Sequence, residues 1–290
     1  MEYELTLTEL IGLIKRQFLV IAGVTTLGTL AAIVYALTAT PVFRAETTLA
    51  PIIEDGNQSS FGGLSGQFGS FASLAGLSFR NSSDIENAKA TLVSRAFTEK
   101  FINDHNLLPR LFEDAWDEES QTWLATDGVE ATGPTSWQAY RVFNNLITLS
   151  EDQQSSLIRL SIDWTDPELA AAWVNSLVEA IDDHIREQDV AEAQKSIEYL
   201  TAQLEETNVV EMQQVLYNLI ETQTRTVMLA NVRDDYVFEV IDPAVIPEEK
   251  FRPQRRLIVI IGFSLSLFAS LIAIVLVDLS RPQNPERAKS

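Results

Sequence analysis

The acidic residues are the first place to look for chemistry, because carboxylates serve as general acids, general bases and metal ligands. Two of them, Asp163 and Asp166, flank a point where a strand pattern changes to a helix pattern. Helix capping accounts for Asp166 and strand alternation for Asp163, so neither is set apart as a catalytic group. The sequence contains no GxSxG, HExxH or kinase motif. We therefore expect no catalytic residues and no enzyme activity.

Patterns that bind metals or phosphates are also missing. The chain has no cysteine, which excludes disulfides and thiolate metal sites. Its two histidines, His105 and His184, are far apart in the sequence and show no ligand spacing. A Gly/Ser-rich segment at residues 56–79 matches neither GxGxxG nor GxxxxGK[ST]. We predict no metal site and no bound cofactor.

One segment, residues 113–135, mixes acidic and aromatic side chains. Such a mixture can bind sugar or calcium, although the EF-hand spacing is absent. A solvated surface loop is the simpler interpretation, and we favour it. The acidic residues are Glu113, Asp114, Asp117, Glu118 and Glu119, and the aromatic ones are Trp116 and Trp123.

Two long apolar segments must position everything else. Residues 257–277 (LIVIIGFSLSLFASLIAIVLV) carry no charge and can cross a bilayer core of about 30 Å as a helix. Residues 18–37 form a similar segment. A cleaved signal peptide is disfavoured there, because the apolar core is too long and three glutamates precede it. Two transmembrane helices would place both termini on one side of the membrane and residues 38–256 on the other.

Small residues recur at every fourth position in both apolar segments. This spacing puts them on one helix face, where they let two membrane helices approach closely. We predict that the two helices pack through these faces. The alternative is that the pattern only reflects how common small residues are in membrane helices. The residues are Gly28, Ala32 and Ala36 in the first segment and Gly262, Ser266 and Ser270 in the second.

A proline-spaced run, DPAVIPEEKFRPQRR at residues 242–256, leads into the second apolar segment. Proline fixes φ and removes a backbone donor, so it stiffens a connector. We hypothesise that Pro243, Pro247 and Pro253 set how the domain meets the second helix. The alternative is that these prolines only end a strand and begin a helix.

The region between the apolar segments has an α+β pattern. Alternating residues predict strands at 41–53, 157–164 and 236–241, and we expect the first and last to pair because both lead to the membrane. Helical spacing predicts one helix from Ser83 or Asp84 to about Leu108.

The longest predicted element is a helix at about residues 166–206. A capping box formed by Thr165 and Glu168 is expected to begin it, with Pro167 in its first turn. At 1.5 Å per residue it would be about 60 Å long, more than a compact domain needs. A shorter helix at residues 212–230 is expected to return beside it. The sequence therefore predicts an α+β base domain with a long helical hairpin projection, flanked by two transmembrane helices.

Charge is concentrated between the apolar segments. Residues 40–250 hold 13 Lys or Arg and 36 Asp or Glu, a net charge of −23, and the rest of the chain has a net charge of +3. An acidic domain disfavours binding to nucleic acid or to anionic lipid. Five basic residues flank the two helices on each side, so the charges predict no orientation in the membrane.

Four stretches in chain order carry a family resemblance. They are PVFRAETTLAP after the first apolar segment, ATLVSRAFTEKFINDHNLLPRLF, LIRLSIDWTDPELAAAWVNSLVEAID, and VIDPAVIPEEKFRPQRR before the second. Together they are similar to segments of the bacterial polysaccharide co-polymerases, also called chain-length determinant (Wzz) proteins. The resemblance extends over nearly the whole chain.

The resemblance implies a two-span protein of the bacterial inner membrane. Residues 1–17 and 278–290 would be cytoplasmic, and residues 38–256 periplasmic. It also implies a ring-like homo-oligomer that regulates the chain length of a surface polysaccharide (O-antigen, capsule or exopolysaccharide) without being an enzyme. A membrane polysaccharide polymerase would be its partner, and contact with the polysaccharide itself is compatible with this role.

Two other functions are compatible with the same layout. A periplasmic adaptor for polysaccharide export would link an inner-membrane transporter to outer components. A sensor would also have two spans and a helical periplasmic domain, but no signalling domain follows residue 277 in this sequence. The tail lacks a tyrosine cluster, which departs from the capsule-type subclass of the family.

Overall fold

The computed structural model describes residues 17–52, 82–124 and 133–280. Contacts divide the chain into two compact units, one formed by Met1–Phe43 with Glu249–Ser290 and the other by Arg44–Glu248. We call them the helix-pair unit and the α+β unit. The predicted N-terminal segment up to residue 16, most of the Gly/Ser-rich segment and the last ten residues lie outside the described residues.

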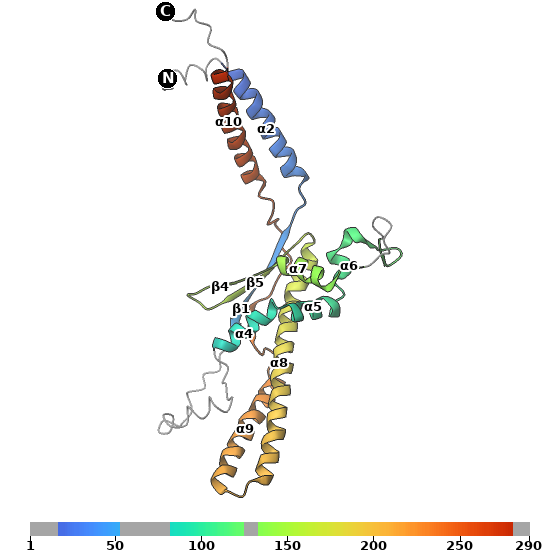
Figure 1. Ribbon diagram of the computed structural model, residues 1–290, viewed down its shortest axis with the longest axis vertical. Coiled ribbons are helices and arrows are strands. Elements are labelled where there is room, and N and C mark those ends of the chain that lie inside the picture. The colour runs from blue at the N-terminus through green and yellow to red at the C-terminus, as the bar shows by residue number, and fades with distance from the viewer. Residues whose placement is uncertain (1–16, 53–81, 125–132, 281–290) are drawn as a thin grey trace, which may run out of the picture. The chain divides into compact units, whose positions relative to one another are not determined.

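The helix-pair unit contains α2 (Phe18–Thr38) and α10 (Arg255–Ser280), which lie side by side (Figure 1). Both predicted apolar segments are therefore helices, and each is long and apolar enough to cross a membrane. Only 11% of the most apolar window of each helix is buried, unlike the core helix of a soluble protein. Next to the helices, Val42 and Arg252 form an isolated antiparallel bridge.

A four-stranded sheet is the base of the α+β unit. Its strands are β1 (Phe43–Pro51), β4 (Ile147–Glu151), β5 (Ile158–Trp164) and β6 (Phe238–Asp242), in the order β4-β5-β1-β6. The first and last strands pair antiparallel, with Leu49 opposite Val240, which confirms the predicted pairing.

Short helices share the hydrophobic core with this sheet. The predicted single helix up to Leu108 is wrong, because the segment is divided into α4 (Ser82–Leu92), α5 (Arg95–Asp104) and α6 (Leu108–Leu111). The Ser94 hydroxyl accepts a hydrogen bond from the Phe97 backbone N–H and begins α5 as a new helix. Asn106, with φ of +49°, follows the end of α5. The break lets α5 direct Phe97 and Phe101 into the core.

Residues 113–124 are the described part of the acidic and aromatic segment that precedes its gap. They contain the turn η1 (Glu113–Ala115) and a two-stranded ribbon, β2 (Trp116–Asp117) with β3 (Thr122–Trp123). Helix α7 (Ser136–Leu146) follows and begins with a capping box between Thr135 and Gln138.

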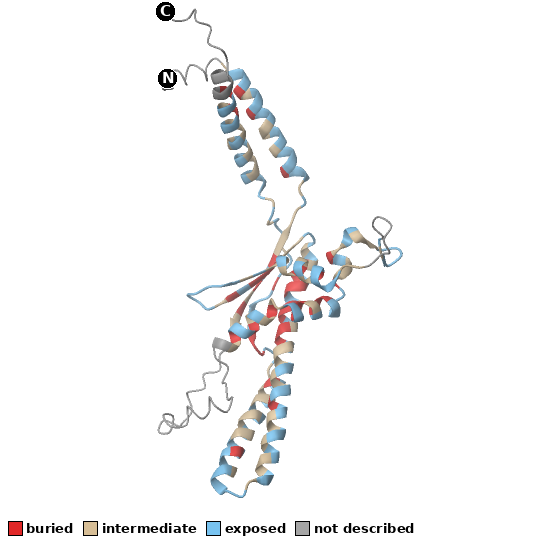
Figure 2. Ribbon diagram, in the orientation of Figure 1, coloured by how far each residue is buried: buried red, intermediate tan, exposed pale blue. Residues whose placement is uncertain are grey.

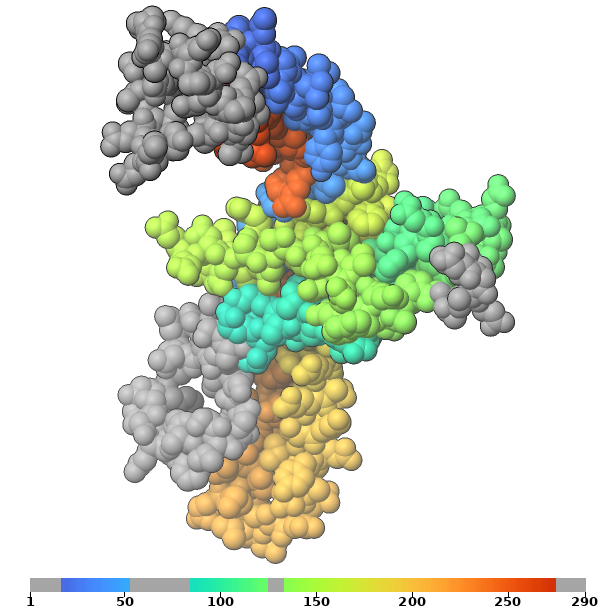
Figure 3. Space-filling view, turned by 45° about the horizontal axis from the view of Figure 1, so that its top comes forward, coloured from blue at the N-terminus to red at the C-terminus, as the bar shows by residue number. Residues whose placement is uncertain are grey.

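The long helix is confirmed as α8 (Pro167–Glu206), with α9 (Val210–Val232) beside it. Its N-cap is Asp166 and not Thr165, since the Asp166 carboxylate accepts hydrogen bonds from the backbone N–H groups of Glu168 and Leu169. The first half of α8 belongs to the core, and the second half has few buried residues (Figure 2). In Figure 3 the yellow and orange atoms of α8 and α9 extend beyond the teal atoms of α4.

A buried carboxylate connects α8 to the start of β6. The Asp182 oxygens accept hydrogen bonds from the backbone N–H groups of Tyr236 at 2.7 Å, Val237 at 2.6 Å and Phe238 at 3.3 Å. Burial raises the pKa of Asp182, while the three N–H donors and the Arg186 guanidinium act to lower it. A second bond, from the Tyr236 hydroxyl to Asp189, reinforces the junction.

A second long-range contact crosses the sheet. The Arg44 guanidinium on β1 donates to both carboxylate oxygens of Asp163 on β5, at 2.6 and 2.8 Å. Two parallel bonds of this kind fix orientation as well as distance. Strand alternation was the only role that the sequence indicated for Asp163. In the structure this residue also joins two neighbouring strands.

We predict that Asp182→Ala destabilises the protein by about 2–4 kcal/mol, because it leaves three buried backbone donors without an acceptor. Urea unfolding followed by tryptophan fluorescence measures the change. The matched control is Asp183→Ala, which removes the adjacent, exposed carboxylate and is expected to cost less than about 1 kcal/mol. Equal destabilisation by the two variants would contradict the assigned role of Asp182.

Candidate functional site

The small-residue faces of α2 and α10 lie against each other. A Cβ atom placed on Gly28 would be 2.5 Å from the Ser266 Cβ, and one placed on Gly262 would collide with Ala32. The Ser266 hydroxyl also lies 3.5 Å from the Thr25 carbonyl oxygen. Ala36 and Ser270, the remaining members of the two faces, are each only 2% exposed. The backbones approach so closely that glycine is required at both contacts.

These pairs also define the direction of the helices. Gly28 faces Ser266, and four residues later on α2 Ala32 faces Gly262, four residues earlier on α10. The helices are therefore antiparallel. A role for this contact in the function of the protein stays a prediction.

The proline run is attached by its backbone at two places. In the α+β unit, the side-chain amide of Asn175 on α8 donates to the Ala244 carbonyl at 2.9 Å and accepts from the Ala244 N–H at 3.0 Å. Pro243 and Pro247 lie on either side of this contact. The Asn175 side chain thus pairs with Ala244 as a neighbouring strand would, an interaction that no sequence pattern indicates.

In the helix-pair unit, the backbone N–H groups of Phe251 and Arg252 donate to the Val42 carbonyl. Pro253 follows directly and precedes α10, and the Arg252–Pro253 peptide bond is cis. The structure therefore positions the three prolines along a connector whose ends are held by hydrogen bonds. Their effect on function stays a prediction.

The α8–α9 hairpin exposes many large apolar side chains. Monomeric soluble proteins rarely expose contiguous apolar patches, and such patches often mark contact surfaces. The tip residue Val210 is 73% exposed, and Val232 at the other end of α9 is 78% exposed. The others that exceed one-third exposure are Tyr199, Val209, Met212, Val215, Tyr217 and Met228.

The two histidines, which sequence spacing did not connect, line one cavity of about 320 Å³ between α5 and α8. His105 packs on the Phe101 ring and His184 on the Phe97 ring, with centroid distances of 4.3 and 5.6 Å. Carboxylates from both helices complete the lining. Within the described residues, however, no three His, Asp or Glu side chains are arranged to hold a metal ion.

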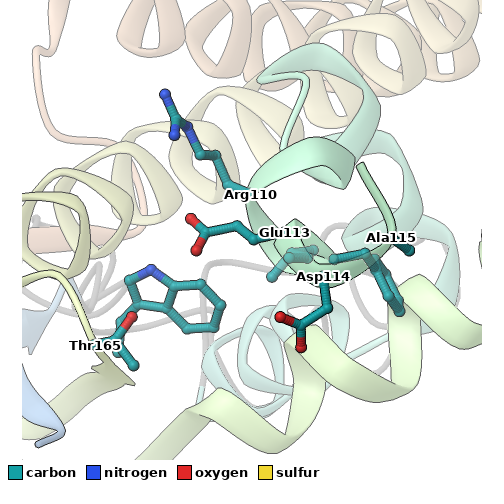
Figure 4. Close-up of a pocket in the computed structure, with 8 residues that line it drawn as sticks. Arg110, Glu113, Asp114, Ala115 and Thr165 are labelled. Carbon is teal, nitrogen blue, oxygen red and sulfur yellow. The ribbon is translucent and has the colours of Figure 1, made fainter. Parts of the chain in front are cut away.

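A second cavity, of about 250 Å³, lies between α6, η1 and the end of β5 (Figure 4). Glu113 and Asp114 line it, together with Arg110, Trp164 and Thr165. The rest of the acidic segment has structural contacts. Trp116 and Trp123 pack edge to face at 4.8 Å, and Asp117 accepts hydrogen bonds within its own turn. Residues 113–124 are thus more ordered than the predicted surface loop.

The helix contact can be tested with disulfide crosslinking, because the chain has no native cysteine. The register of the contacts places Ile21 and Ile274 at about the same level, so Ile21→Cys with Ile274→Cys is the reporter pair. Adding Gly28→Ile or Ser266→Ile should reduce crosslinking severalfold, because the larger side chain separates the backbones.

Gly23→Ile is the matched control, since a Cβ at Gly23 would meet nothing within 4 Å. It should leave crosslinking unchanged. Undiminished crosslinking with Gly28→Ile would show that the helices do not pack through this face.

Part of the chain is similar to a known protein family. Residues 3–105 match the family model described as Wzz, chain length determinant protein. No curated protein has a significant sequence match to the chain.

Solved structures with similarity to the chain include a full-length bacterial polysaccharide co-polymerase, with 13% identity, a TM-score of 0.42 and coverage of 97% of this chain and 100% of that chain. A fragment of WzzB, the polysaccharide co-polymerase from Salmonella Typhimurium, has 13% identity and a TM-score of 0.32, over 73% of this chain and 100% of that one. A mutant of the Shigella flexneri lipopolysaccharide O-antigen chain-length regulator has 10% identity and a TM-score of 0.23, over 72% and 99%.

The family match spans α2, β1, α4 and α5, which include the first apolar helix, the strand that follows it and two short helices of the α+β unit. The similarity to the Wzz chain length determinant family is therefore shown for residues 3–105.

Proposed function

We propose that this protein regulates the chain length of a surface polysaccharide and acts as a non-enzymatic scaffold. The observation that carries the proposal is the match of residues 3–105 to the chain length determinant family. The two apolar helices and the mixed unit between them have the layout expected for such a protein. O-antigen, capsule and exopolysaccharide are all compatible substrates.

In this proposal α2 and α10 cross the bacterial inner membrane and Arg44–Glu248 lies in the periplasm. Both termini are then cytoplasmic. The exposed apolar side chains of α2 and α10 support the membrane assignment, because lipid is the environment that such surfaces require. The side of the membrane follows from the family and not from the charges.

The α+β unit then assembles with other copies into a ring-like homo-oligomer, and a membrane polysaccharide polymerase is the partner. The exposed apolar side chains of the α8–α9 hairpin support self-association. So do β4 and β6, which are the edge strands of the sheet within the part of the chain that the structure describes. Assembly must overcome repulsion, since the region between the helices carries a net charge of −23.

The proline connector would transmit the arrangement of the periplasmic units to the membrane helices. Its attachment to α8 through Asn175 and to Val42 supports this role, because a connector held at both ends has little freedom to absorb movement.

Deletion of the gene, followed by gel analysis of the surface polysaccharide, tests the proposal. We expect polymer to persist without its preferred length, and the wild-type gene on a plasmid should restore that length. Polymer that disappears from the surface and accumulates inside the cell would instead favour an adaptor for export. An unchanged length distribution would overturn both functions.

Pro247→Ala combined with Pro253→Ala is expected to alter the polymer length while the protein stays inserted in the membrane, because the connector loses two fixed φ angles. The readouts are the same gel and membrane fractionation. The control is Pro134→Ala, which changes a proline outside the connector. If the double variant gave the wild-type polymer length, the role of the prolines would be only to end a strand and begin a helix.

A further inference from the structure

The cavity between α6, η1 and the end of β5 contains both donors and acceptors. Arg110 supplies a guanidinium, Glu113 and Asp114 supply carboxylates, and Thr165 supplies a hydroxyl. Figure 4 shows the Glu113 carboxylate extending from η1 into the space toward the strand end that carries Thr165. Phe112 and Trp164 add apolar surface to the same cavity. The proposed scaffold function uses none of these groups.

One of the residues that line this cavity, Trp164, has a donor without an acceptor among the described residues. The indole Nε1 of Trp164 is buried, and no described residue accepts a hydrogen bond from it. The ring itself is held in place by Trp173, at a centroid distance of 5.0 Å. A buried N–H without an acceptor costs about 1–3 kcal/mol. An oxygen acceptor that came within hydrogen-bond distance of this N–H would remove this cost.

The charges restrict what a ligand of this cavity can be. Two carboxylates beside one guanidinium make the cavity unsuitable for a phosphate or another anion, and the surrounding region is strongly acidic. A metal ion is disfavoured as well, since the described residues contain no group of three ligands arranged for one. What remains is a neutral molecule rich in hydroxyl groups.

A pyranose ring has this chemistry. Its hydroxyl hydrogens can be donated to Glu113 and Asp114, and its oxygens can accept from Arg110 and from the Trp164 indole. The apolar C–H groups of the ring can pack on the aromatic surface of the cavity. We propose that this cavity binds an uncharged sugar unit of the polysaccharide whose length the protein regulates.

The proposal rests on the proposed function for its source of ligand, and it adds a direct contact with the polymer. The sugar site lies in the α+β unit at the point where β5 leads into α8. The scaffold would then bind the growing polymer as well as organise the enzyme that makes it.

Binding can be measured by titration calorimetry on the full-length protein in detergent. The probe is a mixture of short neutral oligosaccharides released from the host's surface polysaccharide by mild acid, and sulfated heparin fragments are the anionic comparison. We expect saturable binding of the neutral probe and none of heparin. Absence of binding by the wild-type protein, or preference for heparin, overturns the proposal.

Variants locate the site. Trp164→Phe keeps an aromatic ring but removes the indole donor, and it should weaken binding about threefold to tenfold, the effect of one lost hydrogen bond. Trp137→Phe is the matched control, because Trp137 is exposed on α7 and does not line the cavity. Glu113→Gln, at an exposed position where folding is not at risk, should also weaken binding. Wild-type affinity in both Trp164→Phe and Glu113→Gln overturns the assignment to this cavity.

The same variants separate this proposal from the proposed function. The deleted strain is complemented with the wild-type, Trp164→Phe or Glu113→Gln gene, and polymer length is compared. Length control that is lost on deletion but fully restored by both variants leaves the scaffold function standing and rejects the sugar site. Length control that is unaffected by deletion rejects the scaffold function itself.

Discussion

The α+β unit depends on one buried carboxylate. Asp182 lies on α8, and its oxygens accept three consecutive backbone N–H groups at the start of β6. A buried charge is tolerated only when it is paired and hydrogen-bonded, and the three donors and Arg186 satisfy this condition. The contact holds the last strand against the long helix, beside the point where α8 leaves the core. The positions of β6 and of the proline connector after it follow from that contact.

A different constraint acts on the helix-pair unit. There, small residues allow α2 and α10 to approach until a single added Cβ would collide. Such packing suits a lipid environment, where burial of apolar surface supplies no drive for helices to associate and close contact must do so. The two units are therefore stabilised differently. The α+β unit depends on a buried, hydrogen-bonded charge and on hydrophobic packing, and the helix-pair unit depends on close contact between helix backbones.

Possible functional surfaces lie on different elements of the structure. Among the described residues, the hairpin of α8 and α9 presents apolar side chains, the sheet ends at the edge strands β4 and β6, and polar groups line the cavity beside Trp164. A scaffold that contacts copies of itself, a membrane enzyme and a sugar polymer needs surfaces of different chemistry. The structure distributes them over different elements of the α+β unit.

Local pattern was sufficient for much of this fold. Apolar length predicted α2 and α10, alternation predicted β1 and β5, and Pro167 with helical spacing predicted the 40-residue α8, because each depends on neighbours within a few turns. Only the tertiary structure decided the partners of Asp182 and Asn175, the cavity that His105 and His184 both line, and the cavity beside Trp164. These contacts join residues far apart in the chain, 54 positions for Asp182 with Tyr236 and 69 for Asn175 with Ala244, and no periodicity in the sequence records them. The helix starts at Ser94 and Asp166 could be predicted only in part from the sequence. Polar residues at several adjacent positions can cap a helix, and the packing selects which of them does so.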